Sequence, residues 1–175
     1  MNGDGVETGS LDGGVIGVRP ATAADAAAMA TIYNDAVLHS TATFDLEPQT
    51  EADRRSWLAA GSTRLVLVAE AGGRVVGWAA LVRWSERGAY DQTVEAAVYV
   101  AADRQRSGVG RTLGAALIDG ARRLGLHALV AQVCTENEAG LGLALELGYR
   151  PVGTLREVGV KFGRRLDVAV CELLL

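Results

Sequence analysis

The stretch that decides the fold is Thr93–Arg111, which reads TVEAAVYVAADRQRSGVGR. Apolar residues over Thr93–Val100 predict a β-strand, and the glycine-bearing turn after it predicts a helix over Gly108–Leu124. The apolar run His127–Cys134 predicts the next strand. A strand, a helix and a strand in succession form a parallel crossover, so this stretch predicts parallel pairing in the middle of the chain.

Antiparallel hairpins are expected on both sides of this unit. Gly72 and Gly73 separate two runs rich in valine and leucine, and glycine supplies the positive φ angles of a tight turn. Thr22 and Thr50 resemble the N-terminal caps of two helices. The expected elements, in chain order, are a strand over Val15–Arg19, a helix from Thr22 to about Leu38, a loop over Ser40–Pro48, a helix from Thr50 that ends at Gly61, strands over Arg64–Ala71, Arg74–Val82 and Thr93–Val100, a helix over Gly108–Leu124, a strand over His127–Cys134, a helix over Asn137–Leu147, and strands over about Tyr149–Val158 and Leu166–Leu174.

This order predicts an α/β domain (mixed α+β) with a central mixed sheet and helices on both faces. The hairpins give antiparallel neighbours and the crossover gives parallel ones, so the sheet must contain a place where the pairing changes. Where two adjacent strands diverge, the backbone groups that face the gap take their partners from a ligand or from water. We therefore expect a site there for an extended molecule that carries amide groups.

Composition limits the class of protein. The chain has 175 residues, 49% of them apolar, which suits one domain with its own core. We expect this domain to span residues 15–175, after a flexible leader over residues 1–14 that contains five glycines. The 17 basic and 21 acidic residues give a net charge of -4, so neither nucleic acid nor an anionic membrane is an expected partner.

The lengths of the apolar runs and the spacing of the cysteines favour a cytoplasmic protein. No apolar run approaches the roughly 18 residues that a membrane-spanning helix needs, and the N-terminus lacks a basic stretch followed by a hydrophobic segment. Cys134 and Cys171 lie in apolar runs and lack the close spacing of a zinc or redox motif, so we expect two buried thiols and no metal site.

The turn Asp103–Arg111 carries the first candidate site. Its glycines let the backbone approach a ligand closely, and the free amides at the start of the next helix carry partial positive charge. Arg104, Arg106 and Arg111 add full positive charges, so the turn is suited to a pyrophosphate. A helix start with a solvated basic rim remains the alternative. Neither a Gly-Lys-Ser/Thr phosphate loop nor the six-residue dinucleotide fingerprint occurs.

Glu95 is the second candidate. It shares one face of the predicted strand with Ala97 and Tyr99. It is either an exposed acid on a half-wet face or a general base that removes a proton from an ammonium group. The two histidines, His39 and His127, belong to no recognisable nucleophile set.

These features together resemble the GNAT superfamily of acetyl-CoA-dependent N-acetyltransferases. The Gln-Arg-Ser-Gly-Val-Gly turn follows a Val-Tyr-Val strand, and Asn137 opens the next helix. Five segments are similar to the phosphinothricin and methionine sulfoximine acetyltransferase branch: Ser40–Phe44 (STATF), Thr93–Glu95 (TVE), Val98–Val100 (VYV), Leu126–Ala131 (LHALVA) and Gly159–Val168 (GVKFGRRLDV). The resemblance covers roughly residues 15–175. It implies a GNAT fold with about seven strands, splayed near the middle of the sheet.

The resemblance also implies a role for each matching residue. The backbone of Val98, Tyr99 and Val100 would pair with the pantetheine arm, and Asn137 would bind near the thiol end. The pyrophosphate would be held by the amides of Arg106, Ser107, Gly108, Val109, Gly110 and Arg111. Glu95 would be the catalytic base. The acceptor pocket would include Phe44, Gly88, Ala89, Tyr90, Lys161 and Phe162, partly from a second subunit of a homodimer.

The implied reaction is direct transfer of an acetyl group from acetyl-CoA to the α-amino group of an amino acid or an analogue such as phosphinothricin, methionine sulfoximine or methionine sulfone. Another amine, such as a protein N-terminus, a polyamine or an aminoglycoside, is the first alternative, and a non-catalytic CoA-binding module is the second. Relatives in this branch carry a serine where this chain has Gly140 and a histidine or tyrosine where it has Ala144. No side chain at that place can protonate the departing thiolate.

Overall fold

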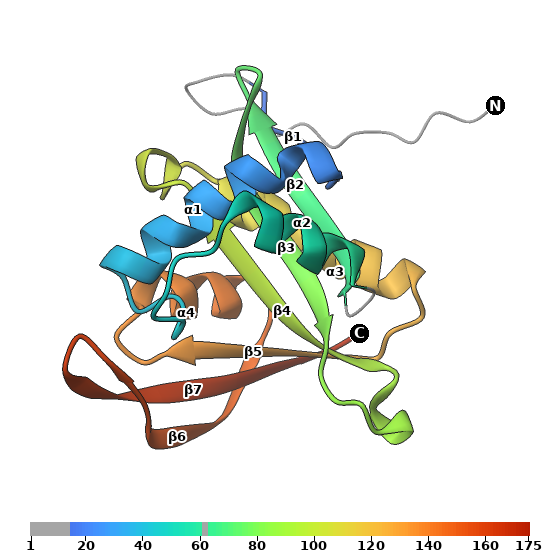
Figure 1. Cartoon of the computed structure of the whole chain (residues 1–175). Helices are drawn as coiled ribbons and strands as arrows, with labels where there is room; N and C mark the ends of the chain where they lie inside the picture. The colour runs from blue at the N-terminus through green and yellow to red at the C-terminus, as the bar shows by residue number, and fades with distance from the viewer. Residues whose placement is uncertain (1–14, 61–62) are drawn as a thin grey trace.

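The structure, a computed structural model, describes residues 15–60 and 63–175 (Figure 1). The predicted leader over residues 1–14 and the predicted end of a helix at Gly61 lie outside the described residues. One seven-stranded sheet has the order β1-β2-β3-β4-β5-β7-β6. Its strands are β1 (Gly17–Pro20), β2 (Thr63–Ala71), β3 (Arg74–Arg83), β4 (Thr93–Val100), β5 (Ala128–Cys134), β6 (Arg150–Lys161) and β7 (Arg164–Leu174). This confirms the predicted mixed sheet of about seven strands.

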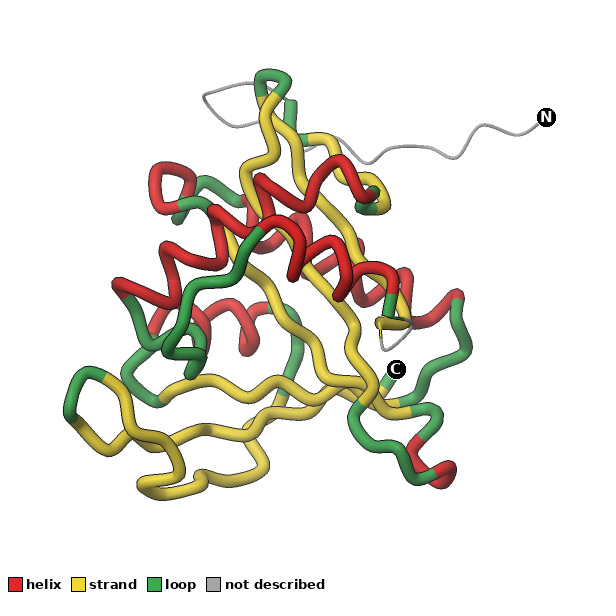
Figure 2. Tube along the Cα trace, in the orientation of Figure 1, coloured by secondary structure: helices red, strands yellow, loops and turns green. Residues whose placement is uncertain are grey.

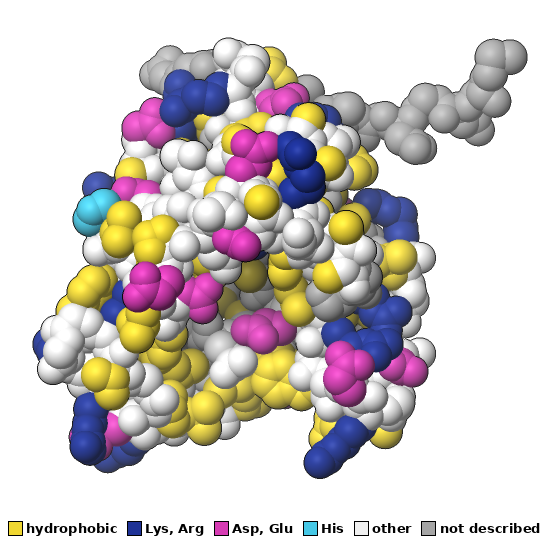
Figure 3. Space-filling view, viewed as in Figure 1, with side chains coloured by type: hydrophobic (Ala, Val, Ile, Leu, Met, Phe, Trp, Pro, Cys, Tyr) yellow, Lys and Arg dark blue, Asp and Glu magenta, His cyan; other side chains and the backbone are white. Residues whose placement is uncertain are grey.

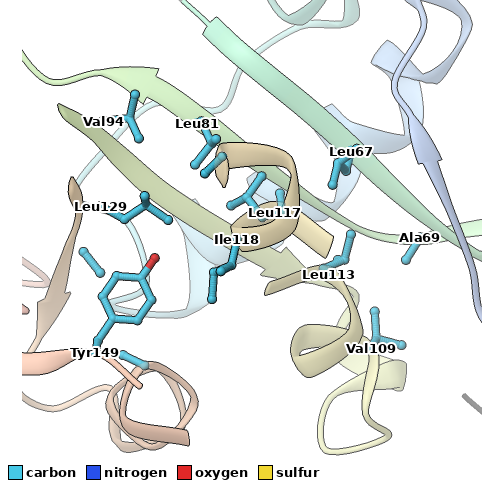
Figure 4. Packing of buried hydrophobic residues seen from close by; sticks show 14 of the residues in the cluster. Leu67, Ala69, Leu81, Val94, Val109, Leu113, Leu117, Ile118, Leu129 and Tyr149 are labelled. Atoms are coloured by element: carbon cyan, nitrogen blue, oxygen red, sulfur yellow. The ribbon is translucent and has the colours of Figure 1, made fainter. Parts of the chain in front are cut away.

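Within the described residues, four α-helices cover the two faces of the sheet (Figure 2). Helices α1 (Ala26–His39) and α2 (Glu51–Ala59) cover one face, where Met29 and Val37 pack with Trp78 of β3. Helices α3 (Val109–Arg123) and α4 (Glu138–Glu146) cover the other. Figure 4 shows this second core, in which α3 packs Leu113, Leu117 and Ile118 against residues of several strands. The central strands of the sheet therefore lie between two helical layers, whereas β6 is exposed along most of its length.

Strands β4 and β5 form the one parallel pair in the described sheet, and they pair over a short length. The register joins Thr93–Glu95 to Ala128–Val130, and beyond these residues the strands separate. Figure 1 shows them diverging from a common point at the lower right. The predicted change of pairing thus lies near the middle of the sheet and produces a V-shaped opening.

Glycine at position 77 lets α3 lie close to the sheet. A Cβ atom on Gly77 would lie 2.9 Å from the carbonyl oxygen of Tyr99 and 3.0 Å from side-chain atoms of Val109 and Leu113. These distances are shorter than an ordinary van der Waals contact. The N-terminal turn of α3 is therefore held directly against β3 and β4.

Two predicted boundaries were wrong. Thr22 forms a capping box with Asp25 around a single 3₁₀ turn, Ala23–Asp25, and α1 begins only at Ala26. The last hairpin is longer than predicted, because β6 continues to Lys161 and β7 begins at Arg164. Phe162 and Gly163 both have positive φ angles, 51° and 71°, and make a two-residue turn between the two strands.

Cys134 and Cys171 are both free and buried, as predicted. Among the helices of the described residues, none has the length and apolar character needed to cross a membrane.

Candidate active site

A cleft occupies the opening between β4 and β5. It has a volume of about 780 Å³, including the part that is open to solvent. Figure 3 shows this side of the molecule hollowed below the helices, with acidic side chains at the rim and hydrophobic side chains below it. The cleft is lined by Ala42, Glu95, Ala96, Ala97, Val98, Tyr99, Gly114, Leu117, Ala131, Gln132, Val133, Asn137, Gly140, Leu143, Ala144, Leu147 and Tyr149.

The pairing of β4 shows which of its backbone amides face the cleft. The N–H of Ala101 donates to the carbonyl oxygen of Val76 at 2.9 Å, so the backbone groups of Ala101 point toward β3. These groups alternate in direction along an antiparallel strand. Those of Tyr99 therefore also point toward β3, and those of Val98 and Val100 point into the opening. The amide of Val98 is thus available to a ligand in the cleft.

Glu95 lies where the two strands begin to separate. Its register partner on β5 is Val130, the last paired residue. Burial raises the pKa of the Glu95 carboxyl, and a hydrogen bond from Gln132 Nε2 to Glu95 Oε1, 3.4 Å long, partly opposes that effect. A half-buried carboxyl with a raised pKa in a cleft is suited to accept a proton from a ligand.

The turn before α3 presents backbone amides toward one end of the cleft. Gly108, the N-cap residue, has a φ of 86°, and Arg106 has a φ of 57°. The first hydrogen bond of α3 joins the Thr112 N–H to the Gly108 carbonyl oxygen at 3.0 Å. The amides of Val109–Arg111 precede that bond and have no partner within the helix. The turn can therefore hold an anionic group by its backbone, as phosphate-binding helix starts do.

The arginines of this turn are partly paired with acids. Arg111 lies 3.0 Å from Glu146 of α4, and Asp103 lies 2.6 Å from Arg74 and 4.0 Å from Arg104. Both acids are about half exposed, so these pairs are weak and can exchange for a stronger anion.

Asn137 lies on the opposite side of the cleft as the N-cap of α4. Its Oδ1 accepts a hydrogen bond from the Gly140 N–H at 3.0 Å. A Cβ atom at position 140 would lie 2.6 Å from Asn137 Nδ2, so the glycine leaves room for this side chain. The cap fixes the Asn137 amide group at the surface of the cleft.

Lys161 joins the last hairpin to the loop over residues 40–48. It is 3% exposed, and its Nζ donates to the carbonyl oxygens of Thr43 at 2.7 Å and Ala36 at 3.3 Å. Burial lowers the pKa of Lys161. The ring of Phe44 packs against Gly159 of β6, where a Cβ atom would overlap it. The hairpin and this loop therefore form one wall beside the cleft.

A buried arginine lies under the same loop. Arg54 is 3% exposed, and its guanidinium lies 4.6 to 4.8 Å from the ring centroids of Tyr33, Trp57 and Trp78. The ring of Tyr99 lies 4.7 Å from Trp78 and 5.0 Å from Tyr33. This cation and the aromatic rings around it hold the Tyr99 side chain on the face covered by α1 and α2.

The cleft gathers some of the predicted site residues and leaves others outside. Glu95, Val98, Tyr99 and Asn137 line it. Gly88, Ala89 and Tyr90 are exposed in a 3₁₀ turn between β3 and β4 and do not line it, and neither do Phe44, Lys161 and Phe162. Sequence reasoning missed Gln132 and Tyr149. Gln132 carried one usable signal, because a polar residue in the apolar run of β5 marks a solvated face.

A sheet opened between two strands, with free strand amides inside it and a glycine-bearing turn of free backbone amides at one end, defines a class of protein: transferases that use an acyl-CoA donor. The sequence profile of the acetyltransferase (GNAT) domain matches residues 18–170. The chain belongs to this family, and it is an acetyltransferase that binds acetyl-CoA.

Individual relatives agree with this assignment. The L-methionine sulfoximine/L-methionine sulfone acetyltransferase of Pseudomonas paraeruginosa is 37% identical over 159 residues, covering 89% of this chain and 92% of the relative. The phosphinothricin N-acetyltransferase of Streptomyces coelicolor is 38% identical over 160 residues, which cover 89% of this chain and 94% of that protein. The structure of a putative acetyltransferase from Salmonella typhimurium, solved with acetyl-CoA, is 39% identical in sequence and has a TM-score of 0.88. The match covers 91% of this chain and 94% of that chain. The family, the fold and the acetyltransferase activity implied by the sequence are confirmed.

Proposed function

We propose that the protein acetylates the α-amino group of an amino acid or of an amino-acid analogue such as methionine sulfoximine, methionine sulfone or phosphinothricin. The names of the relatives described above support this substrate class. The single observation that carries the proposal is the position of Glu95 at the point where β4 and β5 separate, on the strand whose free amides line the cleft.

Glu95 is the general base of the proposed reaction. The ammonium form of an amino acid dominates at neutral pH and cannot attack a carbonyl carbon, so a placed base removes that barrier. The raised pKa of Glu95 makes it a better proton acceptor than an exposed glutamate. A general base of this kind contributes about 10² to 10⁴ in rate.

Val98 stabilises negative charge in the same reaction. Acetyl-CoA supplies an activated acetyl thioester when it is bound. The Val98 amide points into the cleft on the same strand as Glu95, three residues further along, and is suited to stabilise the charge that develops on a carbonyl oxygen. The ionisable side chains that line the cleft are Glu95, Tyr99 and Tyr149. None of the lining residues is a cysteine, serine, lysine or histidine that could carry the acetyl group, so the proposed transfer goes directly from donor to amine.

The donor is held by three groups of residues in this proposal. The amides of Arg106–Arg111 bind the pyrophosphate, the Val98 and Val100 backbone pairs with the pantetheine arm, and Asn137 binds near its thiol end. The glycine-bearing turn, the free strand amides and the capped asparagine all fit such a molecule by their position.

The acceptor pocket is proposed to include Phe44, Lys161 and Phe162 on the loop and hairpin wall, and Gly88–Tyr90 from a second subunit. A homodimer is supported by β6, an edge strand with several exposed apolar side chains. These are Val152, Leu155, Val158 and Val160, with exposures of 46% to 62%.

The cytoplasm is the proposed compartment, which agrees with two free cysteines.

A thiol-release assay with acetyl-CoA tests the substrate class. The amines are methionine sulfone, methionine sulfoximine, phosphinothricin, arsinothricin, the standard amino acids, spermidine, an aminoglycoside and a short peptide with a free N-terminus. We expect the highest kcat/KM with an amino acid or analogue. Preference for spermidine, the aminoglycoside or the peptide would overturn the proposed class, and no thiol release with any amine would indicate a non-catalytic CoA-binding module.

A further inference from the structure

Gln132 is a polar side chain of the cleft that the mechanism above does not use. It lies on β5, which reads ALVAQVC, and it is the one residue of that strand with a carboxamide. Its side chain is exposed and lines the cleft. The hydrogen bond that this carboxamide makes indicates its role.

The register of β4 and β5 places Gln132 on the same face of the sheet as Glu95. Glu95 pairs with Val130, the last paired residue of β5, and paired residues of neighbouring strands point to the same side. Side chains alternate along a strand, so Ala131 points to the other face, where it belongs to the core, and Gln132 returns to the face of Glu95. The two side chains therefore lie on one face at the narrow end of the opening, where β4 and β5 diverge in Figure 1.

A hydrogen bond spans the opening at this point. Gln132 Nε2 donates to Glu95 Oε1 at 3.4 Å. Among the described residues, Gln132 is the one hydrogen-bond donor to this carboxyl. The bond engages one carboxylate oxygen and leaves Oε2 free to take a proton. Hydrogen bonds at catalytic groups commonly shorten when the substrate binds.

This bond matters because a glutamate side chain has several rotatable bonds. Fixing such a side chain in one orientation costs conformational entropy. A tether that is made before the amine binds lowers this cost during the reaction, because the proton acceptor is already in place. The Gln132 amide is neutral, so it orients the carboxylate without pairing its charge with a cation.

Few groups set the charge around Glu95. Both of its cross-strand neighbours, on β3 and β5, are valines, and the loop before α2 contributes Ala42 to the cleft. Burial raises the pKa values of Tyr99 and Tyr149, so both hydroxyls are uncharged near neutral pH. Burial also raises the pKa of Glu95, and the hydrogen bond from Gln132 opposes that effect. Gln132 is therefore the side chain that favours the ionised carboxyl.

We propose that Gln132 is a positioning residue for the reaction: it holds the Glu95 carboxylate at the narrow end of the opening, with Oε1 engaged and Oε2 directed at the acceptor amine. The proton passes from the ammonium nitrogen to Oε2, and Gln132 neither gains nor loses a proton. The nitrogen then forms a bond to the thioester carbon, the carbon–sulfur bond breaks, and the thiolate takes a proton from water. This inference rests on the proposed function, because it requires Glu95 to be the general base.

Gln132→Met tests the tether, because methionine has a similar length and cannot donate the hydrogen bond. We expect kcat at pH 7 to fall about three- to tenfold, with acetyl-CoA affinity unchanged in calorimetry. The loss should shrink as the pH approaches the pKa of the free amine, where the base is no longer needed, whereas a packing defect would persist there. Gln92→Met is the matched control and should match wild type, because Gln92 is exposed just before β4 and does not line the cleft.

The acid limb of the kcat profile gives a second readout, since kcat falls where the base becomes protonated. Loss of the donor removes the effect that lowers the pKa of Glu95. The limb should therefore move to higher pH in Gln132→Met, by about 0.5 pH unit or more. Gln132→Glu places a like charge beside Glu95 and should move the limb further, with the two carboxyls titrating as a coupled pair.

A double-mutant cycle shows whether Gln132 acts through Glu95. In the Glu95→Gln background, Gln132→Met should change kcat by less than about twofold, because the base that it positions is gone. An equal loss in the wild-type and Glu95→Gln backgrounds would overturn the proposal.

The outcomes separate this proposal from the one on which it rests. If amines release thiol from acetyl-CoA, and Gln132→Met has the kcat and the pH profile of wild type, the positioning role is wrong and the proposed function stands. If no amine releases thiol, the proposed function fails, and carbon NMR of protein labelled at its glutamate carboxyls still tests the tether. The Glu95 resonance, assigned by its loss in Glu95→Gln, should titrate at a higher pH in Gln132→Met than in wild type, and equal midpoints would overturn the proposal.

Discussion

At the scale of single residues, the proposed reaction depends most on the position of Glu95. A carboxyl in the interior of a sheet costs free energy when it is charged, because it loses hydration. Here one edge of the strand is open to a cleft, so the carboxyl keeps partial access to solvent and one hydrogen bond from Gln132. The Glu95 carboxyl can therefore ionise without a buried ion pair.

Replacement of this base should reduce turnover. We expect Glu95→Gln to lower kcat at pH 7 by at least tenfold, because the amine must then reach the site already deprotonated. The loss should shrink as the pH approaches the pKa of the free amine, where the base is no longer needed. Glu51→Gln, at an exposed position on α2, is the control. Equal kcat for Glu95→Gln and wild type at pH 7 would remove the base assignment.

Gly140 is the second residue whose replacement tests the site, because the glycine leaves room for the Asn137 side chain. A Cβ atom there would force Asn137 to move, since it would lie 2.6 Å from Nδ2 and 3.0 Å from a Val133 methyl. We expect Gly140→Ala to weaken acetyl-CoA binding about three- to tenfold in calorimetry. Gly142→Ala, on the same helix with open space at its Cβ, should bind acetyl-CoA normally and gain up to about 1 kcal/mol in stability.

At the scale of elements, a buried carboxylate joins the first strand to the first helix. Asp25 accepts hydrogen bonds from both terminal nitrogens of Arg19 at 2.8 Å and from the Thr22 N–H at 2.7 Å. The Arg19 guanidinium holds the pKa of Asp25 well below its usual range, which Thr22 reinforces. The ionised Asp25 carboxyl therefore stabilises the fold fully above its unfolded-state pKa of about 3.9, and this stabilisation is lost as the pH falls through the folded-state pKa.

Removal of this charge should destabilise the fold in a pH-dependent way. We expect Asp25→Asn to lower the free energy of unfolding by about 2 kcal/mol at pH 7, measured by urea denaturation. The difference from wild type should shrink below about pH 4, where the carboxylate of the unfolded chain is protonated. Asp53→Asn removes the exposed counterpart in the Thr50 capping box and should cost less. An equal loss in both variants would contradict the role of burial.

The elements that sequence reasoning predicted correctly are those with local signals. The paired glycines at 72–73, the cap at Thr50, and the alternation of apolar residues along the strands each act over a few residues. The turn at the end of β6 was missed because Phe162 adopts a positive φ that side chains rarely adopt. Gly163 alone did not mark a two-residue turn.

The burial of two cationic side chains was not predicted, because it depends on contacts between distant parts of the chain. Lys161 is buried because Thr43, 118 residues earlier, offers it a carbonyl oxygen. Arg54 is buried because aromatic side chains from α1, α2 and β3 enclose it. No pattern in a single segment of the sequence indicates either arrangement.

At the scale of the whole molecule, the proposed homodimer can be tested by complementation. If Tyr90 of one subunit completes the acceptor pocket of the other, Glu95→Gln and Tyr90→Ala homodimers are each weakly active. A mixed dimer then contains one site in which both residues are intact. We expect activity to rise when the two variants are unfolded together and refolded, measured by thiol release.

The control for this experiment is each variant refolded alone, which should gain no activity. Sedimentation should give a species of twice the 18.3 kDa chain mass. Activity of the mixture that equals the average of the two variants would contradict a shared pocket, and a monomeric mass would contradict the dimer itself.

The short parallel pairing between β4 and β5 has a consequence for the lifetime of the protein. Three residues on each strand connect the two parts of the sheet, so the ladder is complete only when another molecule supplies the missing partners. A ligand that binds only the native state stabilises it in proportion to the logarithm of its concentration. Resistance to proteolysis should therefore rise with the concentration of CoA or acetyl-CoA, because both carry the pantetheine arm that is proposed to supply those partners.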